Sequence, residues 1–215
     1  MHGLRERGVR AALFPNAHAA PRRYAAAVRI IAGELRGRRI APPEGRDTRP
    51  MLDRVREALF ATLGNAVEGA EVLDLFAGTG SLGLEALSRG AAGARFVERD
   101  RRALRLLEQN VLALGQGARA RLVLGDALDP SAWPARAGLV LLDPPYALLR
   151  SAASKERVFE AVGRLHEGTL EPGGCLVLHC HPRDASARDF RADLAVEQRV
   201  YGNTALWYAW KRGSE

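Results

Sequence analysis

The sequence predicts a Rossmann-like α/β fold, in which helices cover both faces of a mostly parallel, seven-stranded sheet. Apolar runs typical of buried strands alternate along the chain with segments of helical periodicity. A glycine-rich turn from Gly78 to Gly83 follows one such run and opens a helix, which is typical of nucleotide-binding folds. Near the carboxyl terminus, Gly202 and Asn203 form a turn between two strands, and we expect this antiparallel hairpin to complete the sheet.

Length and composition indicate one domain with a small appendage. The 215 residues are 47% hydrophobic, which is enough for a single core. The formal charge of +7 favours an acidic partner, although only Lys155 and Lys211 among 32 basic residues are lysines, a bias that a GC-rich genome also produces. Cys175 and Cys180 are too few for a disulfide framework, and no apolar run reaches the roughly 18 residues of a membrane span. We therefore expect a soluble, cytoplasmic protein.

The first 47 residues are predicted to precede the main domain. Residues 1–27 are rich in arginine and alanine and contain two prolines, so we expect a mobile extension, with a basic tail that touches RNA as the alternative. Residues 28–32 and 38–41 are short β-like runs and predict a hairpin, followed by a linker up to residue 47. The hairpin is basic, and its arginines are either solvated charge or contacts to phosphates: Arg29, Arg36, Arg38 and Arg39.

A helix is predicted after Pro50, because apolar residues follow it at steps of three and four. These residues define the expected core face: Leu52, Val55, Leu59 and Leu63. The opposite side carries charge, and one interpretation is a salt-bridged, exposed face on which Arg56 and Glu57 are ordinary surface residues. The alternative is that the segment 48–50 at the start of this helix contributes to binding a ligand.

The strand from Val72 to about Leu75 and the turn after it predict a ligand site. Glycines let a backbone turn sharply and approach a ligand, and the start of the next helix offers unpaired N–H groups. The spacing Gly78-x-Gly80-x-x-Gly83 fits the dinucleotide pattern, but it is weak evidence alone. Asp74 precedes these glycines, and a carboxylate there would repel a pyrophosphate. It favours the positive methionine end of S-adenosylmethionine (SAM), which it can meet directly or through backbone amides and water.

The next two strands each end in an acidic residue suited to the rest of a nucleoside. Glu98 ends the run ARFVE, near the usual place of an acid that binds ribose hydroxyls. Asp126 follows the strand in ARLVLGDAL, where this type of fold can hydrogen-bond an adenine amine. Between them lies a helix that Gly115 ends; its Asn110 is expected to be structural.

The tetrapeptide Asp143-Pro144-Pro145-Tyr146 follows the apolar run 139–142 and indicates chemistry on a nucleobase amine. The lone pair of such an amine is delocalised, so the nitrogen needs acceptors for its hydrogens and a fixed approach to the methyl group. The Asp143 carboxylate and the Pro144 carbonyl would accept the two N–H groups, Pro145 would stiffen the turn, and Tyr146 would stack on the base. The alternative is a stiff turn without chemical function.

The segments after the tetrapeptide give fewer indications of function. Residues 147–154 resemble a flexible loop next to the catalytic turn and are candidates for a lid over the base. A helix and the strand CLVLHC follow. On that strand His179 and His181 face away from Cys180, so a metal site is not expected, and neither histidine is a good candidate for a catalytic base.

With these motifs in place, the sequence resembles the bacterial 16S ribosomal RNA guanine-N2 methyltransferases, which modify the small subunit. The resemblance runs from Val28 to about Arg212, and residues 1–27 lie outside it. The segments that carry it are VRIIAGELRGRRI (28–40), TRPMLDRVREALF (48–60), DLFAGTGSLGLEALSRGA (74–91), FVERD (96–100), LLDPPY (141–146) and YGNTALWYAWKR (201–212). The resemblance implies a class I SAM-dependent methyltransferase domain over residues 48–215. It also implies methylation of the N2 amine of a guanine in 16S rRNA, within an assembling or assembled 30S subunit, by a monomer that needs no metal.

The motifs and the resemblance together give a set of expected site residues. The catalytic set is Asp143, Pro144, Pro145 and Tyr146. The cofactor-binding set is Asp74, Phe76, Ala77, Gly78, Gly80, Glu98, Arg99, Asp126, Ala127 and Asp143. The RNA-binding set is Arg29, Arg36, Arg38, Arg39 and Arg49.

Other functions remain open from the sequence. A DNA adenine-N6 methyltransferase uses the same tetrapeptide on an amine, but this short chain shows no separate target-recognition domain. A nicotinamide oxidoreductase would leave the tetrapeptide unexplained. A non-catalytic RNA-binding or assembly factor would keep the fold for its surface, and the intact motifs argue against it.

Overall fold

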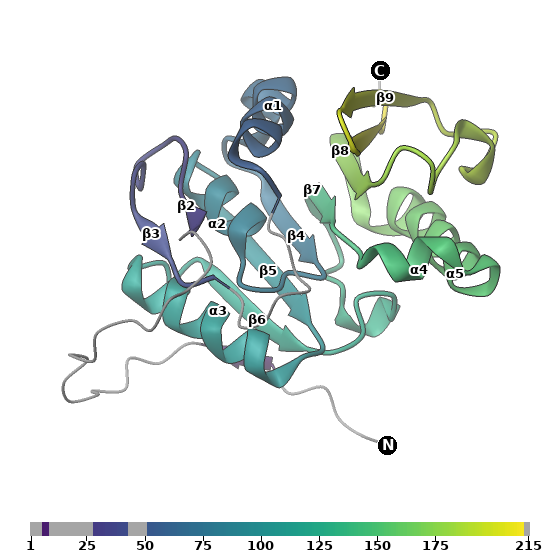
Figure 1. Cartoon of the computed structure of the whole chain (residues 1–215). Helices are drawn as coiled ribbons and strands as arrows, with labels where there is room; N and C mark the ends of the chain where they lie inside the picture. Colours follow the sequence, from purple (N-terminus) through teal and green to yellow (C-terminus); the bar gives the residue numbers. More distant parts are fainter. Residues whose placement is uncertain (1–5, 9–27, 43–50, 213–215) are drawn as a thin grey trace.

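The protein is built on one twisted sheet with helices on both faces (Figure 1). The computed structural model describes residues 6–8, 28–42 and 51–212. The strands of the sheet lie in the order β1-β6-β5-β4-β7-β8-β10-β9. Their bounds are β1 (Glu6–Gly8), β4 (Glu71–Leu75), β5 (Gly93–Glu98), β6 (Ala120–Leu124), β7 (Ala137–Leu142), β8 (Leu170–Cys180), β9 (Val196–Tyr201) and β10 (Thr204–Trp210).

The direction of the strands confirms the predicted topology. Strands β4 to β8 pair in parallel, and β10 is antiparallel to both of its neighbours, β8 and β9. These seven strands form the expected sheet with its antiparallel C-terminal hairpin. The short strand β1 adds to the edge of β6 in antiparallel orientation, so residues 6–8 of the N-terminal extension join the sheet.

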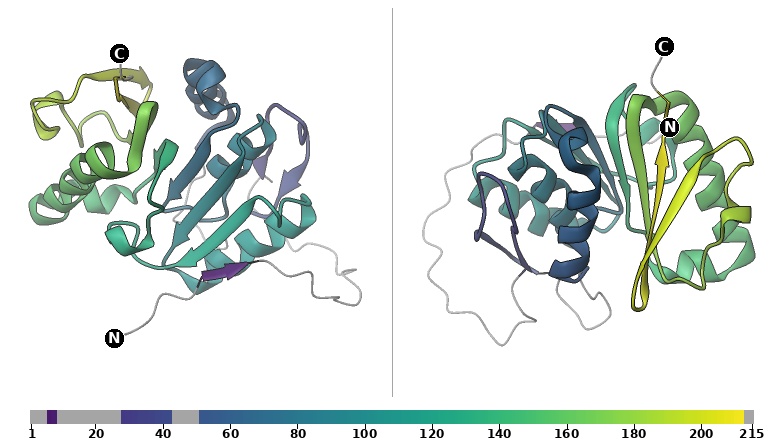
Figure 2. Two further views of the ribbon diagram at one scale, coloured as in Figure 1. Left: turned by 180° about the vertical axis from the view of Figure 1, so that it is seen from behind. Right: turned by 90° about the horizontal axis from the view of Figure 1, so that it is seen from above.

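Apolar runs form the central strands because both faces of the sheet are covered. Along β7, Leu139 and Leu141 belong to one buried cluster, whereas Val140 and Leu142 belong to the other. Successive side chains on a strand point to opposite faces, so a strand that is buried on both sides must be apolar throughout. The helices α1 (Asp53–Leu63), α2 (Ser81–Ser88) and α3 (Arg101–Ala113) pack into the first cluster, and α4 (Tyr146–Arg150) and α5 (Ala152–Arg164) pack into the second (Figure 2).

Short helical turns complete the connections. They are η1 (Gly64–Val67), η2 (Pro130–Ala132), η3 (Leu165–Thr169) and η4 (Ala187–Asp189). Among the described residues, no helix has both the length and the apolar character needed to cross a bilayer.

The predicted N-terminal hairpin is present and packs on the main domain. Strands β2 (Val28–Arg29) and β3 (Arg39–Ile40) pair in antiparallel orientation, and their apolar residues enter the cluster that α1 and α2 share. The carboxylate of Glu85 on α2 accepts hydrogen bonds from the backbone N–H groups of Ile31, at 2.8 Å, and Ala32, at 3.1 Å. Ser88, one turn further on, bonds to the same segment. The hairpin is therefore held by its main chain to the helix that follows the glycine turn.

Two expectations for the segment after Pro50 were wrong. Leu52 precedes α1 as its N-cap and is 56% exposed, so the core face of the helix begins with Val55. Arg56 is not a surface residue: it is fully buried, and it donates to the backbone carbonyl of Arg29 and to Asp53. Its guanidinium also lies 3.7 Å from the buried Glu85 carboxylate. The N-terminal hairpin covers this side of α1, which would be an exposed polar surface if the helix were isolated.

The segment predicted as a flexible lid is helical. Helix α4 begins at Tyr146 itself, and α5 follows from Ala152, with Leu149 buried between them. The segment is therefore helical rather than a loop, and Leu149 packs into the second buried cluster, while the role of the segment as a lid stays a prediction.

Candidate active site

The glycine turn and the Asp143–Tyr146 tetrapeptide lie side by side at the carboxyl edge of the sheet. Strands β4 and β7 are parallel neighbours with Leu75 opposite Leu142, and the backbone N–H of Asp143 donates to the carbonyl of Leu75 at 3.4 Å. From β4 the chain builds the sheet in one direction through β5 and β6, and it then returns to β7 on the other side. The two motifs thus flank the point where strand order reverses, which is where ligands bind in folds of this kind.

The glycine turn has a backbone that other residues adopt only with strain. Gly78 and Gly80 have φ of 56° and 86°, and Phe76 has φ of 60° without being glycine. A Cβ on Gly80 would collide with the side chain of Leu107. Gly80 is the N-cap of α2, so the N–H groups of Ser81, Leu82 and Gly83 have no intrahelical acceptor, and that of Gly83 is taken up by Asp74.

Asp74 lies beneath this helix start. It is 1% exposed, and its Oδ2 accepts a hydrogen bond from the N–H of Gly83 at 2.9 Å. Burial raises the pKa of Asp74 to about 8, and the charges of Asp143 and Glu98 add to the effect, whereas the bond from Gly83 opposes it. The Asp74 carboxyl group therefore holds the start of α2 through a backbone amide, and its contact with the methionine part of SAM stays a prediction.

Glu98 braces the turn from the next strand. Its Oε2 accepts from the N–H of Gly78 at 2.9 Å and its Oε1 from the N–H of Asp100 at 2.7 Å. Arg99 beside it is exposed. The structure thus gives Glu98 a place at the end of β5, in contact with the glycine turn.

Asp126 follows β6 at the same edge of the sheet. Its side chain is 47% exposed; one oxygen accepts from the N–H of Leu128 at 3.0 Å, and the other lies 3.4 Å from the guanidinium of Arg157. Ala127 is buried, and its carbonyl accepts from the indole N–H of Trp133. Asp126 and Ala127 therefore lie at the carboxyl end of the strand next to β5, in line with the turn.

The tetrapeptide presents both an acceptor and an aromatic ring. The Asp143 side chain is 33% exposed, Pro144 is buried, and Pro145 is the N-cap of α4. Tyr146 is 40% exposed, which is unusual for a large side chain in this protein. Partial burial raises the pKa of Tyr146, as does the nearby charge of Asp143, so the hydroxyl stays protonated near neutral pH.

Two contacts at this edge were missed from the sequence. His179 on β8 lies with Nδ1 2.6 Å from Oδ1 of Asp143. Asn110 on α3 donates to the carbonyl of Thr79 in the glycine turn at 3.0 Å and also exchanges bonds with Ala41 behind the hairpin. The position of His179 at the end of β8 could have placed it near Asp143, because β7 and β8 are consecutive parallel strands whose carboxyl ends meet at one edge of the sheet.

The basic hairpin arginines divide by their contacts. Arg29 pairs with Asp53 at 2.9 Å, and Arg38 donates to the carbonyl of Ala113 at the end of α3. Arg36 and Arg39 are exposed. Arg49 lies outside the described residues. A hollow of about 480 Å³ lies at the hairpin, lined by Arg29, Gly37, Arg39 and Asp53.

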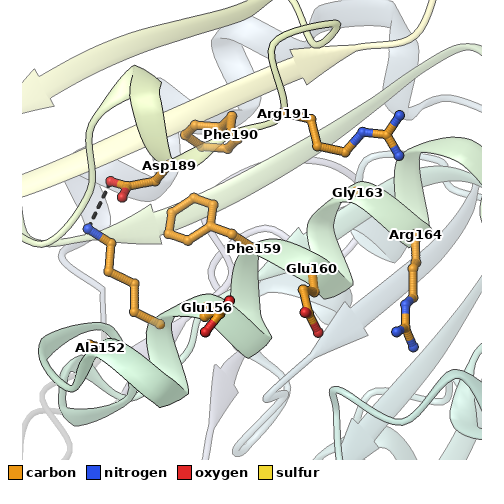
Figure 3. A pocket seen from close by; sticks show the side chains of 10 residues that line it. Ala152, Glu156, Phe159, Glu160, Gly163, Arg164, Asp189, Phe190 and Arg191 are labelled. Atoms are coloured by element: carbon orange, nitrogen blue, oxygen red, sulfur yellow. Dashed lines mark ion pairs between the residues drawn. The ribbon is translucent and has the colours of Figure 1, made fainter.

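A larger hollow, of about 620 Å³, lies between α5 and the segment 189–191 (Figure 3). The rings of Phe159 and Phe190 meet edge to face in it, and Lys155 forms an ion pair with Asp189 at its rim. Its other lining residues are Ala152, Glu156, Glu160, Gly163, Arg164 and Arg191. It contains none of the expected site residues, so it is separate from the site built by the two motifs.

Comparison with known proteins places the chain in a family. The family model described as Conserved hypothetical protein 95 matches residues 28–210. Ribosomal RNA small subunit methyltransferase D of Escherichia coli K12 is 44% identical over 120 residues, which are 55% of this chain and 60% of that protein's length. YlbH of Bacillus subtilis is 34% identical over 193 residues, 86% of this chain and all of that protein.

Solved structures agree with the fold. The structure of yhhF from Escherichia coli has a TM-score of 0.73 and 32% identity, covering 87% of this chain and 99% of that one. At 15% identity, an RNA methyltransferase from Salinibacter ruber, solved with S-adenosyl-L-homocysteine, shares the fold alone, with a TM-score of 0.57 over 78% of this chain and 96% of that one. By the extent of the family match, this chain belongs to the family of Conserved hypothetical protein 95, that of ribosomal RNA small subunit methyltransferase D.

Proposed function

We propose that this protein transfers a methyl group from SAM to the exocyclic N2 amine of a guanine in 16S rRNA. The observation that carries the proposal is the position of Asp143 and Tyr146 beside the glycine turn, at the point where strand order reverses. The name of the Escherichia coli relative supports ribosomal RNA of the small subunit as the substrate. Guanine and its N2 atom come from the resemblance in the sequence motifs. The protein would act as a monomer on an assembling or assembled 30S subunit.

The residues at the edge of the sheet fit SAM. The N–H groups of Ser81 and Leu82 at the start of α2 suit a carboxylate such as that of the methionine part, and the left-handed glycines leave room for a close approach. Glu98 at the end of β5 and Asp126 after β6 lie in the order in which ribose and adenine would follow. The Salinibacter ruber neighbour, solved with the demethylated product of SAM, supports the same ligand class for this fold.

The role of this chain in the chemistry is to hold an amine. SAM supplies a methyl group that is already activated on a positive sulfur, so no covalent enzyme intermediate is required. Asp143, with the Pro144 carbonyl, accepts the amine hydrogens and directs the nitrogen lone pair toward the methyl carbon. Bound SAM would supply the methyl group for the new C–N bond, with the electrons of its C–S bond left on sulfur. The nitrogen then loses a proton to Asp143 or to water.

The surface around the site supports an RNA substrate. Tyr146 is exposed at the start of α4, beside Asp143, where an unstacked base can lie on its ring. The exposed Arg36 and Arg39 of the hairpin offer positive charge to phosphates, and such contacts position RNA without reading its sequence.

Methyl transfer from labelled SAM tests the proposal. The enzyme is offered 30S particles, protein-free 16S rRNA and duplex DNA in parallel, and the products are analysed by nucleoside mass spectrometry. We expect N2-methylguanosine from the ribosomal substrates. N6-methyladenine from DNA, or no product from any substrate, would refute the assignment. In Asp143→Ala we expect turnover to be lost while SAM affinity stays within about twofold, since the residue acts on the amine.

A further inference from the structure

His179 is placed at the reacting edge by the register of two strands. Because β7 and β8 are parallel with Leu142 opposite Leu178, the next residues, Asp143 and His179, come side by side where the strands end. Nδ1 of His179 lies 2.6 Å from Oδ1 of Asp143. His179 is 8% exposed at its side chain and Asp143 is 33% exposed. The carboxylate thus gives one oxygen to a buried partner, while part of the group stays open to solvent.

The hydrogen bond fixes the tautomer of the histidine. An ionised carboxylate can only accept, so Nδ1 carries the hydrogen and donates it. The other ring nitrogen, Nε2, is buried and has no hydrogen-bond partner among the described residues. A neutral ring leaves only a lone pair there, whereas a charged ring would place an N–H group without an acceptor. The unpaired Nε2 therefore favours a neutral His179 ring. The negative charge of Asp143 has the opposite effect and favours the protonated ring.

We propose that His179 is a positioning residue for the methyl transfer, an inference that rests on the function proposed above. Its Nδ1–H holds Oδ1 of Asp143, so that Oδ2 is the oxygen offered to the amine of the substrate. With a neutral ring, Asp143 keeps its full negative charge, accepts the amine hydrogen and takes the proton that the nitrogen releases after methylation. With a charged ring, the ion pair weakens Asp143 as an acceptor, and turnover falls.

The surroundings of His179 allow this titration to be isolated. Burial lowers the pKa of His179, but the charge of Asp143 and its hydrogen bond outweigh burial, so the pKa is raised overall. Among the described residues, the titratable neighbours include Tyr146, whose ring centroid lies 6.0 Å away, and Asp74, which interacts electrostatically with Asp143. Cys180, Asp184 and Arg150 interact electrostatically with Tyr146 in turn. Leu206, opposite on β10, is apolar. Since Asp74 also titrates near pH 8, the comparison must be between variants that differ only at position 179.

Two substitutions separate positioning from titration. His179→Asn places an amide N–H close to the position of Nδ1 but cannot gain a proton, whereas His179→Leu removes the donor. His181→Asn is the matched control, because His181 is two residues further on and bonds to the N–H of Arg183 instead. For each protein, kcat and KM for 30S particles or 16S rRNA are measured from about pH 6 to 9, with SAM affinity and the urea midpoint as controls for folding.

We expect His179→Leu to lower kcat about 100-fold, with SAM affinity unchanged, because the acceptor is no longer held in place. His179→Asn should keep kcat within about tenfold of the wild type at pH 8 and lose the fall of kcat at acidic pH. His181→Asn should follow the wild-type profile. A wild-type rate in His179→Leu, or an unchanged acid limb in His179→Asn, would overturn the positioning role while leaving the proposed function intact. A wild-type protein that methylates no nucleic acid would overturn both.

Discussion

Asp74 gives a prediction about stability that can be worked out from the structure. Its pKa is raised by burial from the usual 3.8 to about 8. Between these values the folded protein binds a proton that the unfolded chain releases, so stability falls as pH rises from about 4 to about 8. A shift of about four units corresponds to roughly 5 kcal/mol, and relaxation around the charged group reduces it, so we expect a loss of roughly 2–5 kcal/mol over this range.

Asp74→Asn removes the titration and keeps an acceptor for the N–H of Gly83. We therefore expect the variant to be more stable than the wild type at pH 8, and the two to approach each other at pH 4 to 5. Urea unfolding followed by tryptophan fluorescence, between about pH 5 and 8 without ligand, measures the effect. Glu57→Gln removes a carboxylate from an exposed position on α1 and should reproduce the wild-type pH dependence. If the Asp74→Asn curve runs parallel to the wild-type curve, Asp74 does not titrate in the folded protein as described.

Three further predictions address the base, the buried ion pair and the RNA. Tyr146→Ala should raise KM for RNA by roughly 10- to 100-fold, in keeping with the loss of one stacked base, and Tyr146→Phe should restore it; a wild-type KM in the alanine variant would refute stacking. Glu85→Gln should lower the unfolding free energy by roughly 3 kcal/mol in urea titrations, because the fully buried Arg56 then keeps only Asp53 as an ionic partner; a change below about 1 kcal/mol would contradict a contribution from this pair. The double variant Arg36→Gln and Arg39→Gln should weaken RNA binding and reduce the magnitude of its logarithmic salt dependence by roughly two, and an unchanged slope would exclude phosphate contacts.

Features that depend on local pattern were predictable from the sequence. The segment 72–75, apolar except for Asp74, and the apolar run 139–142 predicted buried strands, and alternating apolar residues of β7 do enter two different clusters. The positions of Asp74, Glu98, Asp126 and Asp143 at the ends of parallel strands followed from strand order. Because the carboxyl ends of parallel strands lie at one edge of the sheet, a motif that follows such a strand can be placed at that edge from the sequence alone.

Features that depend on what packs against an element were not predictable. Arg56 occupies the polar side of α1, so helical periodicity places it in solvent until the hairpin covers that side. His179 differs little in the sequence from His181, and only the register of β8 against β7 brings it to Asp143. Helix α4 has no capping signal, and the buried Leu149 fixes it instead. In each of these three cases the observed structure depends on a tertiary contact that the local sequence pattern does not reveal.

The manner in which the hairpin is attached has a consequence for how such proteins diverge. Glu85 and Ser88 contact the main chain of residues 31–35, and only the amide and carbonyl groups of that segment are used. Any residue other than proline supplies the same amide, so the exposed side chains of the hairpin, such as Arg36 and Arg39, can change during evolution without moving its position, whereas Val28 and Ile40 are held in the core. Relatives can therefore acquire a different charged surface above the same scaffold. Glu85 and Arg56, buried beneath it, cannot vary as freely.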